Sequence, residues 1–149
     1  MKAQIFLIIL AIAAGAVLPL QAGLNVQLGK SVHQPIFAAF ASFLIGTVGL
    51  FIYLLILKFD FSTMSQTKSV SLVVWTAGIL GAFYVAAVII LAPKLGTALT
   101  FVLVVAGQMV VSLVFDHYGL LGLPTKHINW QRFIGVAFLI TGVLMIRRF

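Results

Sequence analysis

The sequence has 149 residues, of which 63% are hydrophobic and 7% are charged. A soluble domain needs about a quarter charged residues to cover its surface, so this composition excludes a soluble enzyme domain and predicts a chain immersed in lipid. The net charge of +7 comes from nine Lys and Arg spread singly among apolar runs, which excludes the continuous basic face of a nucleic-acid-binding protein.

The first half of the chain contains two apolar stretches, each long enough for a spanning helix of about 20 residues. The first, residues 3–24, contains Pro19, which removes an internal hydrogen bond and should kink the helix. The second, residues 35–57, begins with a proline suited to a first helical turn. A polar loop at 58–71 follows it.

The second half contains three more stretches. Residues 72–91 form the third predicted span, and a tight turn at 92–96, which holds both Pro and Gly, leads to the fourth span at 97–115. A second polar loop precedes the fifth span at 130–146. These runs are continuously apolar and lack the alternation of membrane β-strands, so we expect an all-α membrane protein with one transmembrane domain covering residues 1–149.

The positive charges give little direction to the topology. Five spans place the termini on opposite sides, and the Lys and Arg then divide five against four: Lys2, Lys58, Lys68, Lys126 and Arg132 against Lys30, Lys94, Arg147 and Arg148. Orientation follows an excess of these residues on the cytoplasmic side, and here the excess is small. Insertion in both orientations and insertion with the N-terminus inside are both open. The first would allow an antiparallel ten-helix dimer with inverted-repeat symmetry, an arrangement common in transporters.

Three uncharged amides lie at or near membrane depth. Gln21 and Asn25 follow Pro19 and are four residues apart, so they share one helix face, and Gln108 lies in the middle of the fourth span. An amide without a partner in hydrocarbon is costly, so each must meet protein, water or a ligand. They could line a substrate cavity opened at the kink, or they could form hydrogen bonds between helices.

Asp116 and His117 end the fourth span. A carboxylate near lipid could carry a proton or an ion, or it could form a helix-end pair with a base such as Arg132. No paired carboxylates, nucleotide loop or metal-binding cluster is evident in the sequence, so we expect no catalytic residues, no metal, no cofactor and no enzyme activity.

Five segments together resemble the YdcZ-like family, the five-span branch of the drug/metabolite transporter superfamily. They are Pro19-Leu20-Gln21-Ala22 with Asn25, the segment at 42–46, the segment at 92–96, Ala106-Gly107-Gln108, and Asp116-His117-Tyr118-Gly119. The resemblance implies a bacterial inner-membrane protein of five helices. Members of this branch look like half-transporters that occur as single units, as pairs or as fused ten-helix chains, and for this chain we expect a homodimer or a pair with a related five-helix chain.

The small multidrug resistance proteins, a related branch, use a glutamate in the first helix to exchange protons for cationic drugs. This chain has no acid there, so a neutral, zwitterionic or anionic metabolite is easier to accommodate than a cation. We therefore expect a small-molecule transporter that works by alternating access in the lipid bilayer, with Gln21, Asn25 and Gln108 binding the substrate. The alternatives are a non-transporting subunit or regulator of a partner protein and, less favoured, a lipid flippase.

Overall fold

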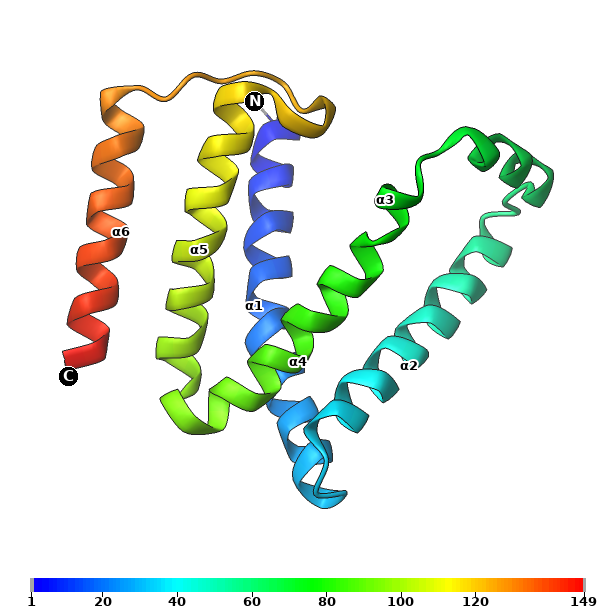
Figure 1. Ribbon diagram of the computed structural model, residues 1–149, viewed down its shortest axis with the longest axis horizontal. Coiled ribbons are helices and arrows are strands. Elements are labelled where there is room, and N and C mark those ends of the chain that lie inside the picture. The colour runs from blue at the N-terminus through cyan, green and yellow to red at the C-terminus, as the bar shows by residue number, and fades with distance from the viewer. Residues whose placement is uncertain (1, 149) are drawn as a thin grey trace. The chain divides into compact units, whose positions relative to one another are not determined.

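The computed structural model describes residues 2–148, and the chain forms two compact units whose boundary follows Pro93 (Figure 1). Within residues 2–148, five helical segments are long and apolar enough to cross a membrane, which confirms the predicted number of spans. They are Lys2–Ser31, Pro35–Ile56, Leu72–Leu95, Thr97–Tyr118 and Trp130–Arg148.

Four of these segments continue past the residues at which the sequence pattern suggested an end, and the first and third are extended most. Helix α1 (Lys2–Ser31) runs through Pro19 to Ser31, and no second proline follows until Pro35. Helix α4 (Ala77–Leu95) similarly includes Pro93, and the chain turns at Gly96, whose φ of +85° favours glycine. The tight turn expected at 92–96 is therefore confined to Gly96, and residues 92–95 belong to helix α4.

The polar loop at 58–71 contains a short 3-10 helix, η1 (Phe61–Ser69). Asp60 caps it, since Oδ1 accepts a hydrogen bond from the Ser62 backbone N–H at 2.9 Å and Oδ2 accepts one from the Ser62 hydroxyl at 2.8 Å. These two bonds stabilise the carboxylate and lower the pKa of Asp60 below its ordinary value. The third span then begins as α3 (Leu72–Trp75) and continues after Thr76 as α4.

In the first unit, α1 and α2 (Pro35–Ile56) form an antiparallel hairpin (Figure 1). The two helices come close at Gly29, because a Cβ placed there would lie 3.2 Å from Pro35 Cα and 3.5 Å from Ala38 Cβ. Small residues at such positions let helix backbones come close. A small apolar core then joins α1, α2 and α4, and it contains Ala38, Ala39 and Ile89 with Val26, Leu28, Val85 and Ala86 packed against them.

In the second unit, α5 (Thr97–Tyr118) and α6 (Trp130–Arg148) pack side by side (Figure 1). The chain leaves α5 at Gly119, whose φ is +60°, and passes through the short η2 (Leu120–Gly122). A Cβ on Gly119 would lie 2.6 Å from Thr125 Oγ1, so this sharp exit requires glycine. Asn129 then caps α6 by accepting a hydrogen bond from the Arg132 backbone N–H at 2.9 Å.

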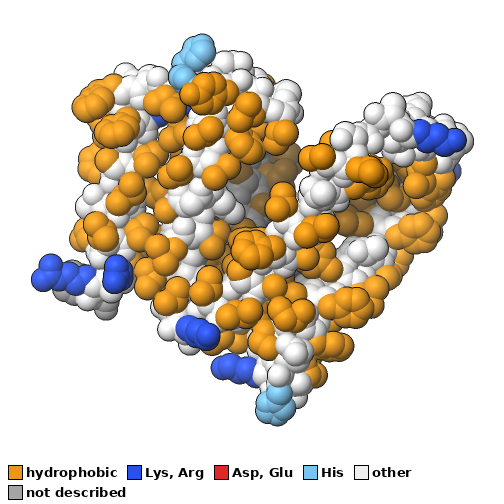
Figure 2. Space-filling view, viewed as in Figure 1, with side chains coloured by type: hydrophobic (Ala, Val, Ile, Leu, Met, Phe, Trp, Pro, Cys, Tyr) orange, Lys and Arg blue, Asp and Glu red, His pale blue; other side chains and the backbone are white. Residues whose placement is uncertain are grey.

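The surface of both units is apolar along the helices. Figure 2 shows hydrophobic side chains covering the helices, with the visible Lys and Arg gathered at their ends. Large apolar residues such as Ile45 and Phe83 are more than two-thirds exposed, which water would oppose and hydrocarbon accepts. The distribution therefore fits helices that face lipid along their length and reach the headgroups at their ends.

Candidate functional site

Two of the three predicted amides meet in the first unit. The Gln21 side-chain Nε2 donates to Ser42 Oγ at 3.5 Å, and the Asn25 Nδ2 donates to the same oxygen at 3.3 Å. Gln21 and Asn25 lie one turn apart on α1, and Ser42 faces them from α2. The structure thus joins two helices through a polar cluster, Gln21, Asn25 and Ser42, in an otherwise apolar hairpin.

This cluster lies on a groove between α1 and α2 with a volume of about 260 Å³. Apolar side chains form most of its wall: Val17, Leu20, Leu24, Leu28 and Ile45. Asn25 is 8% exposed, whereas Gln21 and Ser42 are half-buried. An apolar cleft with a few convergent polar groups is the usual form of a small-molecule site.

The cluster retains hydrogen-bonding capacity after its internal bonds are made. A primary amide offers two N–H donors and a carbonyl acceptor, and a serine hydroxyl can donate as well as accept. Among residues 2–148, the side-chain bonds of Gln21 and Asn25 are those to Ser42. Both carbonyl oxygens, one N–H of each amide and the Ser42 hydroxyl hydrogen therefore stay available to a ligand that both donates and accepts.

Gln108 lies on α5, in the second unit. Its side chain is exposed, and it is not among the residues that line the groove between α5 and α6. An amide at this depth is costly to leave in hydrocarbon, so we expect Gln108 to meet a partner or a ligand in the membrane. Its assignment to the substrate site stays a prediction.

Asp116 and His117 lie in the last turn of α5 and bond to neighbouring segments. Arg132 Nη1 is 3.1 Å from Asp116 Oδ2 and donates also to the Lys126 carbonyl at 3.1 Å. His117 Nδ1 accepts from the Ile128 backbone N–H at 3.2 Å. This is the geometry of a helix-end pair, and partly exposed pairs of this kind contribute about 0–1 kcal/mol.

The ion pair closes one end of a second groove, about 490 Å³ in volume, between α5 and α6. Apart from Asp116, Arg132 and Ser112, its lining is apolar or glycine. An ion or proton role for Asp116 and His117 stays a prediction.

Ser42 is the functional candidate that sequence reasoning missed. The spacing of Ser42 and Gly46 indicated close helix packing, and it carried no chemical assignment. A signal was present, since a hydroxyl near the middle of a spanning helix needs a partner just as an amide does. Pairing the polar residues of adjacent antiparallel spans by depth would have placed Ser42 opposite Gln21 and Asn25.

The five long apolar helices within residues 2–148 support a multi-pass membrane protein. A family model described as "Putative inner membrane exporter, YdcZ" matches residues 6–145, so the chain belongs to the YdcZ family. The description of this family indicates a membrane exporter. Neither a curated protein nor a solved structure gave a match to the chain.

Proposed function

We propose that this protein exports a small metabolite across the bacterial inner membrane by alternating access. The family description supports export, and the polar cluster on the α1–α2 groove supports a substrate site. One observation carries the proposal: two amides converge on Ser42 Oγ inside a lipid-spanning hairpin and keep donors and acceptors free. Pro19, two residues before Gln21, would supply a bend at which the helix flexes.

The charges of the site favour an uncharged, zwitterionic or anionic substrate. The two carboxylates of the chain are Asp60, in the loop after α2, and Asp116, at the end of α5. The helices α1, α2 and α4 therefore carry no acid that could neutralise a cation or take part in proton exchange. Binding a free cation among amides and apolar side chains would leave its desolvation largely uncompensated.

Export can be tested without knowing the substrate. Proteoliposomes are loaded with a small-molecule extract of bacterial cells, and mass spectrometry follows which compounds leave faster than from protein-free liposomes. Selective release of one compound or one chemical class supports the proposal. If no compound leaves faster, the protein is better explained as a non-transporting subunit or regulator.

Gln108→Leu tests whether the second unit contributes to the same site. If Gln108 contacts the substrate, the change abolishes release of the exported compound while the helicity and melting temperature stay those of the wild type. Leucine has a similar size and suits a lipid-facing position, so folding is expected to tolerate it. Unchanged release would remove Gln108 from the substrate site.

We further propose that two copies pair in antiparallel fashion, which would give ten helices related by an inverted repeat. The near balance of Lys and Arg, five against four, supports insertion in both orientations. A related five-helix chain could replace the second copy. Pairing would also give exposed groups such as Gln108 a neighbour beyond their own unit.

If the chain inserts in both orientations, its C-terminus lies on both sides of the membrane, and reporter proteins fused to the C-terminus should be active on both sides. A phosphatase that works outside the cytoplasm and a fluorescent protein that works inside should each give a clear signal. The double substitution Lys58→Gln and Lys68→Gln changes the numbers of Lys and Arg on the two sides of the membrane from five against four to three against four. It should therefore shift the two reporter signals in opposite directions. A strong signal from one reporter alone, in wild type and variant, would contradict dual insertion.

A further inference from the structure

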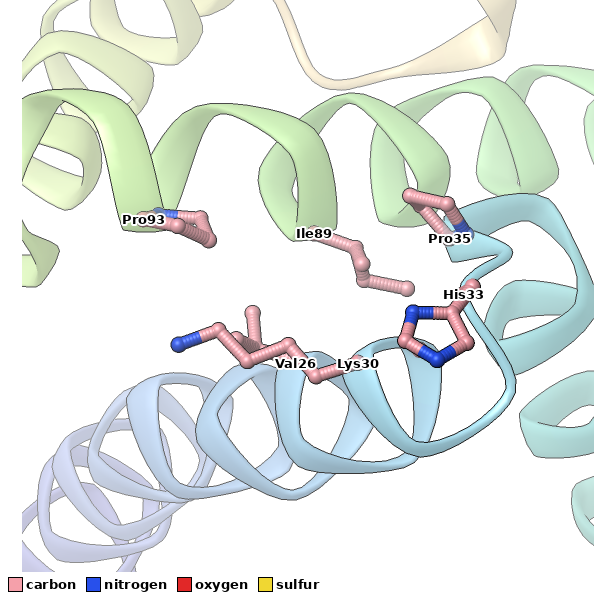
Figure 3. Close-up of a pocket in the computed structure, with 7 residues that line it drawn as sticks. Val26, Lys30, His33, Pro35, Ile89 and Pro93 are labelled. Atoms are coloured by element: carbon pink, nitrogen blue, oxygen red, sulfur yellow. The ribbon is translucent and has the colours of Figure 1, made fainter.

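A second polar feature of the first unit lies at the turn between α1 and α2. There a pocket of about 450 Å³ opens between the end of α1, the start of α2 and α4 (Figure 3). Its lining consists of Val26, Gly29, Lys30, His33, Pro35, Ile89 and Pro93. Figure 3 shows Ile89 reaching from α4 toward α1, with the His33 ring at one end and the Lys30 ammonium extending toward Pro93.

The backbone at His33 has a conformation that glycine normally adopts. The Gln34 N–H donates to the Gly29 carbonyl at 2.9 Å and the His33 N–H to the Lys30 carbonyl at 3.3 Å, which is the Schellman pattern that ends many helices. The φ of His33 is +55°, and glycine or asparagine usually takes this position. The turn itself therefore does not call for histidine, and the imidazole lines the pocket.

The charge of the pocket points to an anion. Lys30 brings a full positive charge, His33 brings a ring N–H, and the lining includes no carboxylate. Among residues 2–148 the structure has one salt bridge, which joins Arg132 to Asp116 in the second unit. Within this range, Lys30 and His33 therefore form no salt bridge with a carboxylate. A lysine and a histidine without an acid, walled by Val26 and Ile89, suit a phosphate or carboxylate better than a neutral group.

We propose that this pocket binds an anionic phosphate or carboxylate group, held by Lys30 and His33. Its place at the end of α1 corresponds to headgroup depth, where basic pockets between membrane helices bind anionic lipids. The anion can thus belong to a phospholipid headgroup or to a free small molecule. The binding is a property of the α1–α2 turn and α4, and it does not require the protein to be an exporter.

The test has a lipid arm and a free-anion arm, both with the full-length protein. Native mass spectrometry measures retention of phosphatidylglycerol over phosphatidylcholine from mixed micelles. In the second arm, NMR of histidine-labelled protein follows the ring signal that disappears in His33→Gly while inorganic phosphate is added. Lys30→Gln, Lys30→Arg and His33→Gly are compared with Lys68→Gln, a control at the end of η1.

We expect Lys30→Gln and His33→Gly each to weaken binding of the anion by about tenfold, because each removes a charged or polar hydrogen bond. Lys30→Arg and Lys68→Gln should bind as the wild type does. His33→Gly should melt at the wild-type temperature or above it, since glycine suits the left-handed turn. Lost binding in that variant therefore cannot be attributed to unfolding.

The two arms separate the sources of the anion. Specific retention of lipid without a phosphate response assigns the pocket to a headgroup, and the reverse assigns it to a free anion; both results support the proposal. The proposal is overturned if neither anion binds, or if Lys68→Gln weakens binding as much as Lys30→Gln. The latter result would mean that positive charge attracts anions regardless of its place.

Discussion

Asn25→Leu is expected to slow release of the exported compound from proteoliposomes by about tenfold or more, with little change in folding. The change removes one of the two bonds to Ser42 Oγ and the free carbonyl of Asn25. Losing about 1.4 kcal/mol of interaction with the substrate in the rate-limiting state is enough for a tenfold effect. Leucine has as many side-chain non-hydrogen atoms as asparagine, so the contact between α1 and α2 should persist.

Gln27→Leu is the matched control, because Gln27 is another α1 amide but is exposed and does not line the groove. We expect its release rate to equal that of the wild type. Equal rates for Asn25→Leu and Gln27→Leu, with both proteins folded, would show that the cluster does not contact the exported compound.

Gly29→Leu is expected to destabilise the first unit by about 1–3 kcal/mol, in the range of overpacked cores. A Cβ at this position already comes within 3.2 Å of the Pro35 backbone, and the further carbons of leucine would push α1 and α2 apart. The melting temperature of the purified protein in detergent should therefore fall by several degrees. The expected loss of packing also includes the core around Ala38.

Gly23→Leu provides the comparison for this change. Gly23 lies on the same helix, but a Cβ there would meet no heavy atom within 4 Å. Its melting temperature should equal or exceed that of the wild type, since leucine favours helix and suits a lipid-facing position. If both variants melt at the same temperature, Gly29 does not hold the hairpin together.

The fold was largely predictable because lipid imposes one strong constraint. Backbone groups in hydrocarbon must be paired within a helix, so a continuous apolar run such as 35–57 is sufficient to identify a span. The exact ends were less predictable. Pro93 can stay within α4, and the left-handed turn that ends α1 uses His33 where glycine is common, so the residue types alone gave no clear boundary.

The candidate site was predictable in part for a related reason. A polar residue within a predicted membrane span requires a hydrogen-bond partner, so Gln21 and Asn25 could be selected from the sequence. The partner was harder to select, because Ser42 lies 17 residues beyond Asn25 and only the pairing of two antiparallel spans by depth points to it. The pocket with Lys30 and His33 also depends on α4, whose Ile89 is distant in the sequence.

If the proposed substrate site is correct, the Gln21–Asn25–Ser42 cluster faces a space that admits polar molecules. The chain contains no cysteine, so Ser42→Cys introduces one thiol at the cluster, and Val48→Cys introduces one on the same helix at an exposed position outside the groove. Both proteins are treated in membranes with a charged, membrane-impermeant methanethiosulfonate reagent. We predict rapid modification of Ser42→Cys and little modification of Val48→Cys; equally slow modification of both would contradict a substrate site at this cluster.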